Sequence, residues 1–322
     1  MLLTDRFRND KILYKAVIIL AQTKLNNIQM MILAAAALLP AVILLIYIYK
    51  KDRVEKEPAG LIFSLLLFGA LVGMPVALVE TFIDSTVLRN TIFYDAWYRS
   101  SMTGEIIWDK GAYILYAFIE NFFGVALIEE LGKRSVMRLL THNNPNFNSL
   151  FDGVVYGVCA ALGFAALENV TYVLANARSG GMSAGLDVAL MRAFLSVPSH
   201  MFFGIIMGYH YSYAHAGERA AALERHYAKM GLITVTNTFS GKSNMRKSLW
   251  IPVAVHGLYD FLLSIDLFYP AIALVAVMYI VCFRRVRMMS DMDIEEDRLA
   301  YAMILQKYPE LKYHTDTNTM SV

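Results

Sequence analysis

The sequence predicts an all-α protein, a polytopic transmembrane helix bundle of about seven spans, and three observations support this prediction. First, 57% of the 322 residues are hydrophobic and only 17% are charged, whereas soluble domains carry roughly 45–50% and about 25%. Second, the mean hydropathy is +0.46. Third, about seven apolar runs approach the ~20 residues that a helix needs to cross a bilayer. Backbone groups in lipid must be satisfied within their own segment, so these runs are expected to be helices.

The composition also excludes several function classes. An ordinary soluble enzyme or a disordered chain does not have this apolar content. The net charge of +2 is too small to predict nucleic-acid binding. The two cysteines, Cys159 and Cys282, lie far apart inside apolar runs, and we expect them to be small buried hydrophobic residues.

The first four runs are long enough to cross a bilayer. They are 28–49 with Pro40, 59–83 with Pro75, about 113–131 with a helical pattern that continues to 140, and 154–174. The fifth run, about 188–213, contains Pro198, which is expected to break its helix. The sixth and seventh runs, 249–263 and 269–283, are short for a crossing. The connection at 175–187 is expected to be a loop.

The chain divides into three parts. Residues 1–27 place lysines around a segment too short to span a membrane, which favours an interfacial amphipathic helix. Residues 28–283 form the multi-pass membrane domain, and residues 284–322 form a tail. The acidic stretch 291–298 within that tail is expected to be a solvated helix.

Basic residues gather on three segments that fall on one side of the membrane if the spans alternate. These segments are 50–58, 214–248 and 284–287. Cytoplasmic connections carry an excess of Lys and Arg, so we expect the tail in the cytoplasm and the protein in the cell membrane. Residues 1–27 would then lie outside although they carry five Lys and Arg. That conflict leaves the number of spans open.

Several ionisable residues lie within or at the edge of the apolar runs. They are Glu120, Glu129, Glu130, Glu168, His200, His256 and Asp260. Each costs about 2.5–3.5 kcal/mol on insertion scales, so four or five facing lipid singly would cost on the order of 10 kcal/mol. We therefore expect these side chains to turn inward and to share a polar cavity.

Helical spacing supports a shared cavity on two of the spans. Glu129 and Lys133 are four residues apart, so they share a helix face and can pair. Glu130 points about 100° away from Glu129 and is available for a second task. His256 and Asp260 are also four residues apart. A carboxylate in that position can orient an imidazole and fix its tautomer.

The fourth and fifth spans add further polar groups. Glu168 and Asn169 lie deep in an apolar run of small residues, where they either join helices or take part in chemistry. Ser196 and His200 flank Pro198, and the carbonyl that this proline frees beside a histidine would make a ligand pocket.

Four spans thus each contribute a Glu or a His to one chamber. Such a set suits either a metal-activated water or a metal-free general base with histidine electrophiles. Oxygen and imidazole ligands without a thiolate suit zinc among other divalent metals. Two alternatives use the same residues: a proton-coupled transporter with broken helices, and a non-catalytic membrane sensor or scaffold.

Four motifs resemble, in the same order, those of the PrsW-type intramembrane proteases. They are Glu129-Glu130-x-x-Lys133, Phe164-x-x-x-Glu168, Ser196-x-x-x-His200 and His256-x-x-x-Asp260. The stretches 52–58 and 152–169 are also similar to that family, and the resemblance extends from about residue 30 to about residue 285. It implies a bacterial multi-pass endopeptidase, related to the CAAX-prenyl proteases and the bacteriocin-processing enzymes. The implied substrate is a membrane-anchored protein such as an anti-sigma factor.

The resemblance also implies roles for individual residues. The implied catalytic residues are Glu129, Glu130, Glu168, His200 and His256, and the supporting residues are Lys133, Asp260, Ser196 and Asn169. If a divalent metal such as zinc takes part, its implied ligands are Glu130, Glu168, His200 and His256. Without a metal, Glu129 or Glu130 is the base and the histidines stabilise the oxyanion.

The depth of these residues sets a test for a single site. Glu129 is expected near the inner end of its span, and Glu168 nearer the outer end of the next. One site requires the groups to lie within about 15 Å, half of a bilayer core. The serine pattern GxSxG at 181–185 falls in an expected loop and is not expected to be a nucleophile.

Overall fold

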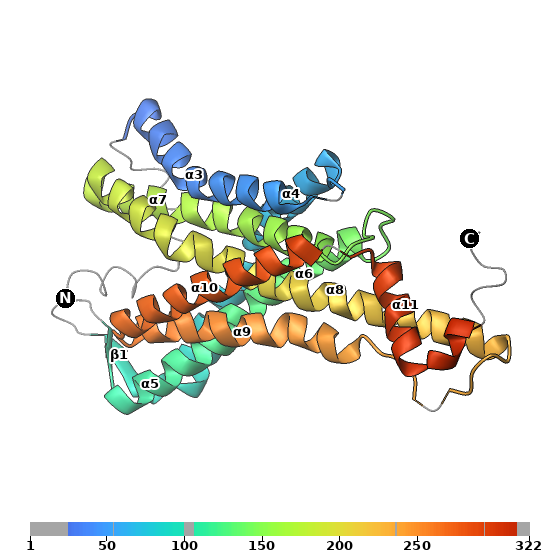
Figure 1. The fold of residues 1–322 in the computed structure, drawn as a ribbon. Helices are drawn as coiled ribbons and strands as arrows, with labels where there is room; N and C mark the ends of the chain where they lie inside the picture. The colour runs from blue at the N-terminus through green and yellow to red at the C-terminus, as the bar shows by residue number, and fades with distance from the viewer. Residues whose placement is uncertain (1–24, 54, 100–105, 236, 293, 314–322) are drawn as a thin grey trace.

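The computed structural model describes residues 25–53, 55–99, 106–235, 237–292 and 294–313, and most of them are helical. The predicted all-α bundle is confirmed, and Figure 1 shows its long helices packed along one another. The predicted interfacial segment at 1–27 lies outside the described residues, apart from 25–27.

The helices account for almost every predicted run. They are α3 (Asn27–Lys51), α4 (Ala59–Phe82), α5 (Lys110–Ile119), α6 (Leu127–Thr141), α7 (Asp152–Phe194), α8 (Ser196–Lys229), α9 (Lys242–Ser264), α10 (Phe268–Met292) and α11 (Glu296–Lys307). The helix α3 begins at a capping box, in which Gln29 N donates to Asn26 Oδ1 at 2.9 Å and Asn26 N donates to Gln29 Oε1 at 3.0 Å.

Short elements connect these helices. The π-helix η1 (Ile83–Ile92) extends α4, and the π-helix η3 (Glu120–Ala126) joins α5 to α6. The 3-10 turn η2 (Tyr94–Ala96) leads into an antiparallel hairpin of β1 (Trp97–Arg99) and β2 (Ile106–Trp108), and the 3-10 turn η4 (Pro309–Tyr313) follows α11. In Figure 1 the hairpin and α11 lie at opposite ends of the elongated bundle.

Four helical stretches are long and apolar enough to cross a membrane. They are Asn27–Lys51, Ala59–Ile92, Lys110–Thr141 and Asp152–Lys229. The first three contain the first three predicted spans, and the fourth contains the fourth and fifth. The two short predicted runs lie within the longer helices α9 and α10. The total of about seven crossings remains a prediction.

The helix α7 turns back on itself at Gly181, whose φ of 82° and ψ of 178° interrupt the helical backbone. A Cβ on Gly185 would lie 2.6 Å from Ala177 Cβ, a contact that requires the two limbs to run side by side. The predicted loop at 175–187 is therefore wrong, because helix continues on both sides of one glycine that tolerates a positive φ. Ser183 of the GxSxG pattern lies within the second helical limb.

The core lies around α7 and α8, which pack with their backbones almost in contact. A Cβ on Gly157 would lie 2.3 Å from the carbonyl oxygen of Gly204, so no larger residue fits at this crossing. Cys159 and Cys282 are free and buried, as predicted. This close packing places the first limb of α7 directly against the helix that carries His200.

The helix α11 packs against the last turns of α8. The chain before α11 pairs with the chain before α7, because Glu296 N donates to Asn148 O at 2.8 Å and Leu150 N donates to Ile294 O at 3.1 Å. Glu296 is fully buried. The expectation of a solvated helix at 291–298 is therefore wrong for Glu296, because tertiary partners cover its carboxylate.

Candidate active site

The first turn of α6 holds the pair of glutamates, directly after the π-helix η3. Lys133 Nζ donates to Glu129 Oε2 and to Glu130 Oε1, both at 2.8 Å, and all three side chains are buried. The predicted pairing of Glu129 with Lys133 is confirmed, and Glu130 joins it from the position three residues before the lysine. π-Helical turns are frequent at functional sites because they alter the register of the side chains that follow.

His200 on α8 faces this group with one ring nitrogen. Its Nδ1 lies 3.1 Å from Lys133 Nζ, and its Nε2 lies 2.8 Å from Glu168 Oε2 on α7. A lysine ammonium only donates, so Nδ1 accepts and Nε2 carries the proton that is donated to Glu168. The Nδ1 lone pair of His200 therefore accepts from Lys133 Nζ, the same ammonium that donates to both glutamates.

His256 on α9 has a different pair of partners. Its Nδ1 lies 2.9 Å from Glu130 Oε1, and its Nε2 lies 3.0 Å from Asp260 Oδ2. Both partners are carboxylates, so the ring satisfies both by donating from each nitrogen, as an imidazolium does. The predicted pairing of His256 with Asp260 is confirmed. Its ring stacks on Phe203 at a centroid distance of 4.6 Å.

The hairpin of α7 holds Glu168 in place through a residue that the sequence analysis missed. Arg192, on the second limb, forms an ion pair with Glu168 Oε2 at 2.9 Å and donates from Nε to Asn169 Oδ1 at 2.8 Å. Asn169 in turn donates to Ala37 O of α3 at 2.6 Å. Arg192 is buried, and an arginine inside the predicted fifth span was the signal available in the sequence.

Glu80 on α4 is a second residue that the sequence analysis missed. Its Oε1 is buried and has no hydrogen-bond partner among the described residues. Glu80 lies within electrostatic range of Glu129, Glu168, His256 and Lys133, and so beside the same group. Glu80 lies within the predicted second span, so the insertion cost of a carboxylate was the signal for it.

The side chains that were expected to converge thus form one connected cluster. We call it the acid–imidazole cluster: Glu129, Glu130, Lys133, Glu168, His200, His256 and Asp260. The centroids of its two imidazole rings are 5.5 Å apart. The gap in depth expected between α6 and α7 is closed, because His200 bridges Lys133 and Glu168. Ser196 lies one turn before His200, and no hydrogen bond joins it to the cluster within the described part of the chain.

Three members of the cluster fit a metal ion. Glu129, Glu130 and His200 each offer a ligand atom, and these atoms lie within 4.8 Å of one another. Glu130 Oε2 is buried without a hydrogen-bond partner among the described residues, which leaves an acceptor to be satisfied. Two carboxylates and an imidazole are ligands that zinc accepts. Lys133 Nζ contacts the same three residues, so a metal and this ammonium would compete for one position.

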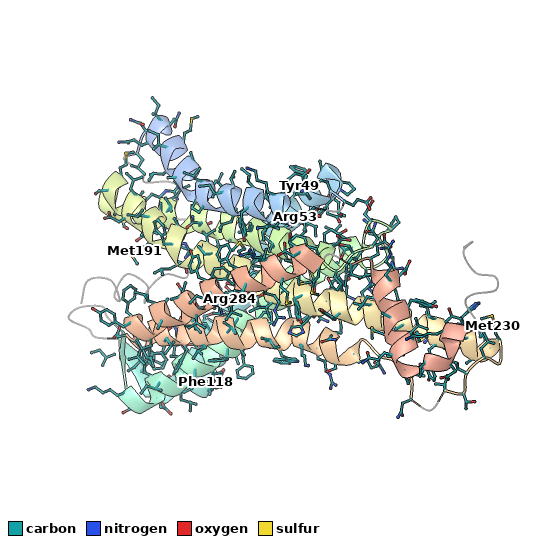
Figure 2. The ribbon with its side chains drawn as sticks, in the orientation of Figure 1. Tyr49, Arg53, Phe118, Met191, Met230 and Arg284 are labelled. Atoms are coloured by element: carbon teal, nitrogen blue, oxygen red, sulfur yellow. The ribbon has the colours of Figure 1, made fainter. Side chains whose placement is uncertain are left out.

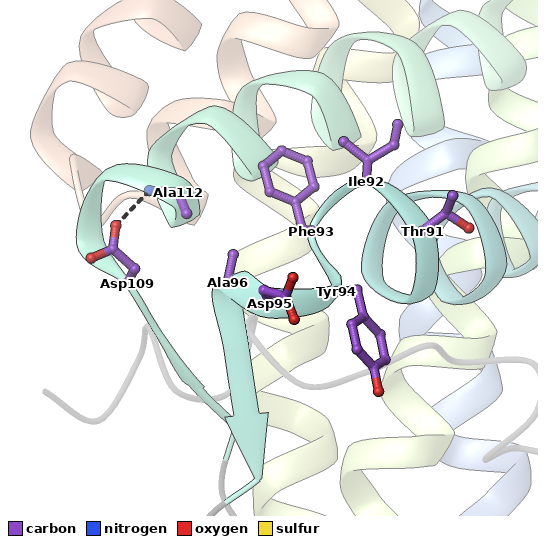
Figure 3. Close-up of a pocket in the computed structure, with 8 residues that line it drawn as sticks. All are labelled: Thr91, Ile92, Phe93, Tyr94, Asp95, Ala96, Asp109 and Ala112. Atoms are coloured by element: carbon purple, nitrogen blue, oxygen red, sulfur yellow. Dashed lines mark hydrogen bonds between the residues drawn. The ribbon is translucent and has the colours of Figure 1, made fainter.

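A separate hollow of 390 Å³ lies at the hairpin end of the bundle. Figure 3 shows it between the end of η1, the turn η2 and the start of α5, where Asp109 caps the helix by accepting from Ala112 N at 3.0 Å. None of its lining residues belongs to the acid–imidazole cluster.

Comparison with known proteins shows which protein family this helical bundle and its cluster belong to. A family model described as PrsW family intramembrane metalloprotease matches residues 57–284, more than half of the chain. The chain belongs to this family. Membership makes it a peptidase that is held in the membrane by several helices, and the transporter and scaffold alternatives are set aside. No solved structure matches the chain.

Individual PrsW relatives cover most of the chain. It is 30% identical to the Protease PrsW of Oceanobacillus iheyensis over 73% of this chain and 84% of that protein. It is 28% identical to the Protease PrsW of Halalkalibacterium halodurans over 81% and 98%. The identity to the Protease PrsW of Bacillus subtilis is 24% over 73% and 84%. The region matched by the family model includes every member of the acid–imidazole cluster.

Proposed function

We propose that this PrsW-family protein is an endopeptidase that hydrolyses a peptide bond of a membrane-anchored protein, and that the acid–imidazole cluster is its active site. One observation carries the proposal: Glu129, Glu130 and His200 offer ligand atoms within 4.8 Å of one another in the interior of an apolar bundle. The transporter alternative does not require such a grouping, whereas activation of a water molecule does.

The substrate and the topology follow from the family and from the charge pattern. The family resemblance supports a membrane-bound anti-sigma factor as the substrate. The basic segments 50–58, 214–248 and 284–287 support a cytoplasmic tail. The same division keeps residues 1–27 as an interfacial segment, residues 28–283 as the protease domain and residues 284–322 as the tail.

The metal site is proposed to use Glu130 and His200, whereas Glu129, the third residue of this group, is left for proton transfer. A divalent metal such as zinc would polarise the peptide carbonyl and acidify a water molecule there. Glu168 accepts the Nε2 proton of His200, so the Nδ1 lone pair, which accepts from Lys133 Nζ here, would bind the metal once the metal displaced that ammonium. Arg192 holds Glu168 in turn.

Proton transfer is assigned to Glu129. Its carboxylate accepts from Lys133, whereas Glu130 Oε1 is held by both Lys133 and His256. The less constrained carboxylate is the better acceptor for the proton of the attacking water. His256, donating to Glu130 and Asp260, places a positive charge beside the position where the oxyanion forms.

The decisive experiment is cleavage of a single-span reporter by the purified full chain in liposomes. Glu130→Gln is expected to lower the cleavage rate by about 10³-fold, within the range for loss of a catalytic carboxylate. The matched control is Glu295→Gln, which removes an exposed carboxylate far from the cluster. Full activity of the Glu130→Gln protein would refute the assigned site.

Metal binding has a test that does not depend on activity. Lys133→Met removes the competing ammonium, so zinc affinity measured by calorimetry is expected to rise relative to the unaltered chain. A fall in zinc affinity in this variant would show that the metal position differs from that of Lys133. The double variant Glu130→Gln/His200→Gln is expected to lose binding.

A further inference from the structure

A group of basic and phenolic side chains lies where α8, α9 and α10 meet, outside the active site. Arg285 of α10 donates to Tyr209 Oη of α8 at 3.3 Å, and its guanidinium carbon lies 4.5 Å from the centre of the Tyr209 ring. Arg285 and Lys247 on α9 both lie within electrostatic range of His210 on α8. We call these four residues the basic cluster.

No carboxylate in the described part of the chain neutralises the positive charge of the basic cluster. Within the described ranges, neither Lys247 nor Arg285 forms an ion pair with a carboxylate. The partners of Arg285 and His210 are instead neutral, namely Tyr209 Oη and, at 3.4 Å from His210 Nδ1, Asn244 Oδ1. Two cations on separate helices beside one histidine repel each other unless an anion lies between them.

Apolar surface leads directly to the basic cluster along two helices. On α10, Val277 and Val281 precede Arg285 on the same face by about two turns and one turn, and they are 56% and 53% exposed. On α9, Trp250 follows Lys247 by one turn and is 50% exposed. Half-exposed tryptophans are typical of the level of the lipid headgroups.

We propose that the basic cluster binds the phosphate of an anionic phospholipid, whose acyl chains lie along Val277, Val281 and Trp250. Basic pockets between transmembrane helices suit such headgroups because their charge is concentrated at the edge of the hydrocarbon. A free phosphate would use only the charged part of this surface and none of the apolar stripe. The proposal does not depend on the catalytic roles assigned above.

Neighbouring residues supply a matched control. Arg246 and Arg284 are exposed and precede Lys247 and Arg285 directly in sequence, so they point about 100° away around their helices. Figure 2 labels Arg284 on α10, between Met191 toward one end of the bundle and Met230 at the other. Replacing these two arginines removes the same charge from the same helices without touching the basic cluster.

The experiment titrates the delipidated full chain with phosphatidylglycerol and counts bound lipid by native mass spectrometry. Lys247→Gln/Arg285→Gln is expected to weaken binding by about tenfold or more, because each basic residue near an anionic surface contributes. Arg246→Gln/Arg284→Gln is expected to change it by less than about twofold. Arg285→Lys keeps the charge and is expected to retain most of the binding, which separates loss of the site from loss of the fold.

Three results would overturn the proposal. Equal weakening by both double variants would show that only the general surface charge matters. Equal binding of phosphatidylcholine would show that the anionic headgroup is not recognised. Displacement of the lipid by inorganic phosphate at an equal concentration would show a phosphate site that makes no use of the acyl chains.

Discussion

Two of the histidines on the helix α8, His200 and His215, lie about four turns apart, and their partners differ. His200, inside the bundle, has a lysine on Nδ1 and a carboxylate on Nε2. His215, toward the end that carries α11, has Glu296 Oε2 on Nδ1 at 2.6 Å and the carbonyl oxygen of His142 on Nε2 at 3.2 Å. One ring therefore faces a donor and an acceptor, and the other faces two acceptors.

This difference separates a reactive histidine from a structural one. His200 retains a lone pair because a donor faces Nδ1, whereas His215 uses both nitrogens to hold its neighbours. Arg219 adds an ion pair to Glu296 Oε2 at 2.8 Å, so His215, Arg219 and Glu296 together fasten α11 to α8. We call these three residues the C-terminal clamp. Partners, more than burial, decide what each imidazole can do.

The largest expected effect comes from exchanging the two histidines for glutamine separately. His200→Gln is expected to lower the cleavage rate of the liposome reporter by about 10³-fold, since it removes the Nδ1 lone pair that faces Lys133 beside the two glutamates. His215→Gln is expected to leave the rate within about threefold, because the clamp lies outside the acid–imidazole cluster. Equal losses of cleavage in the two variants would remove the distinction drawn here.

The next largest effect concerns the arginine that pairs with the carboxylate partner of each histidine, Arg192 for His200 and Arg219 for His215. Arg192→Met is expected to reduce cleavage by about 10- to 100-fold, the usual cost of removing a group that orients a ligand. Arg192→Lys is expected to restore part of the activity because it keeps the charge beside Glu168. Arg219→Met is the matched control in the clamp. If Arg192→Lys is no better than Arg192→Met, the ion pair with Glu168 is not what matters.

A smaller effect is expected from the clamp itself. Glu296→Gln leaves the partly buried donors of His215 and Arg219 without a carboxylate, which costs about 1–3 kcal/mol of stability. Limited proteolysis of the detergent-solubilised chain is expected to cut the connection before α11 faster, while reporter cleavage stays unchanged. Lost reporter cleavage with an intact α11 would contradict this division of roles.

The smallest effect tests Glu57, a carboxyl group that forms no ion pair among the described residues. Burial raises the pKa of Glu57 to about 8, the charge of Asp152 adds to this, and the hydrogen bond from Tyr156 at 2.7 Å only partly offsets it. The folded chain then keeps a proton that the unfolded chain loses above its ordinary value of 4.5. Stability is therefore expected to fall as the pH rises from about 4.5 to about 8.

Thermal unfolding measured between pH 5 and pH 8 checks this sign. Glu57→Gln cannot lose a proton, so its unfolding midpoint is expected to vary less over that range than that of the unaltered chain. A midpoint that rises with pH in the unaltered chain would show that Glu57 is ionised in the fold.

The sequence was sufficient for contacts set by a single helix. The pairs Glu129–Lys133 and His256–Asp260 followed from the four-residue spacing, and the apolar runs predicted the bundle. Contacts between helices could not be predicted from local spacing. Lys133 and His200 are 67 residues apart in the sequence, and His256 and Glu130 are 126 residues apart. Their convergence was predicted only from the cost of leaving charges in lipid.

Other features had weak signals in the sequence. The turn in α7 is made by Gly181 alone, and the residues on both sides of it are helical. The sequence does not mark so short a turn, so a loop of ordinary length was expected. That turn is what brings Arg192 beside Glu168. The clamp joins His215 to a residue 81 positions away, and no local periodicity indicates such a contact.

The hydrogen bond from Asn169 to the Ala37 carbonyl limits which chimeras can be made by replacing α3 with the first helix of a related protein. The family match begins at residue 57, downstream of α3, yet α3 supplies an oxygen for the residue that also steadies Arg192. A replacement helix must place a small side chain and a backbone carbonyl at the position of Ala37, opposite Asn169. Complementation by such chimeras would be read out as rescue of reporter cleavage, and helices shifted by a single residue should fail.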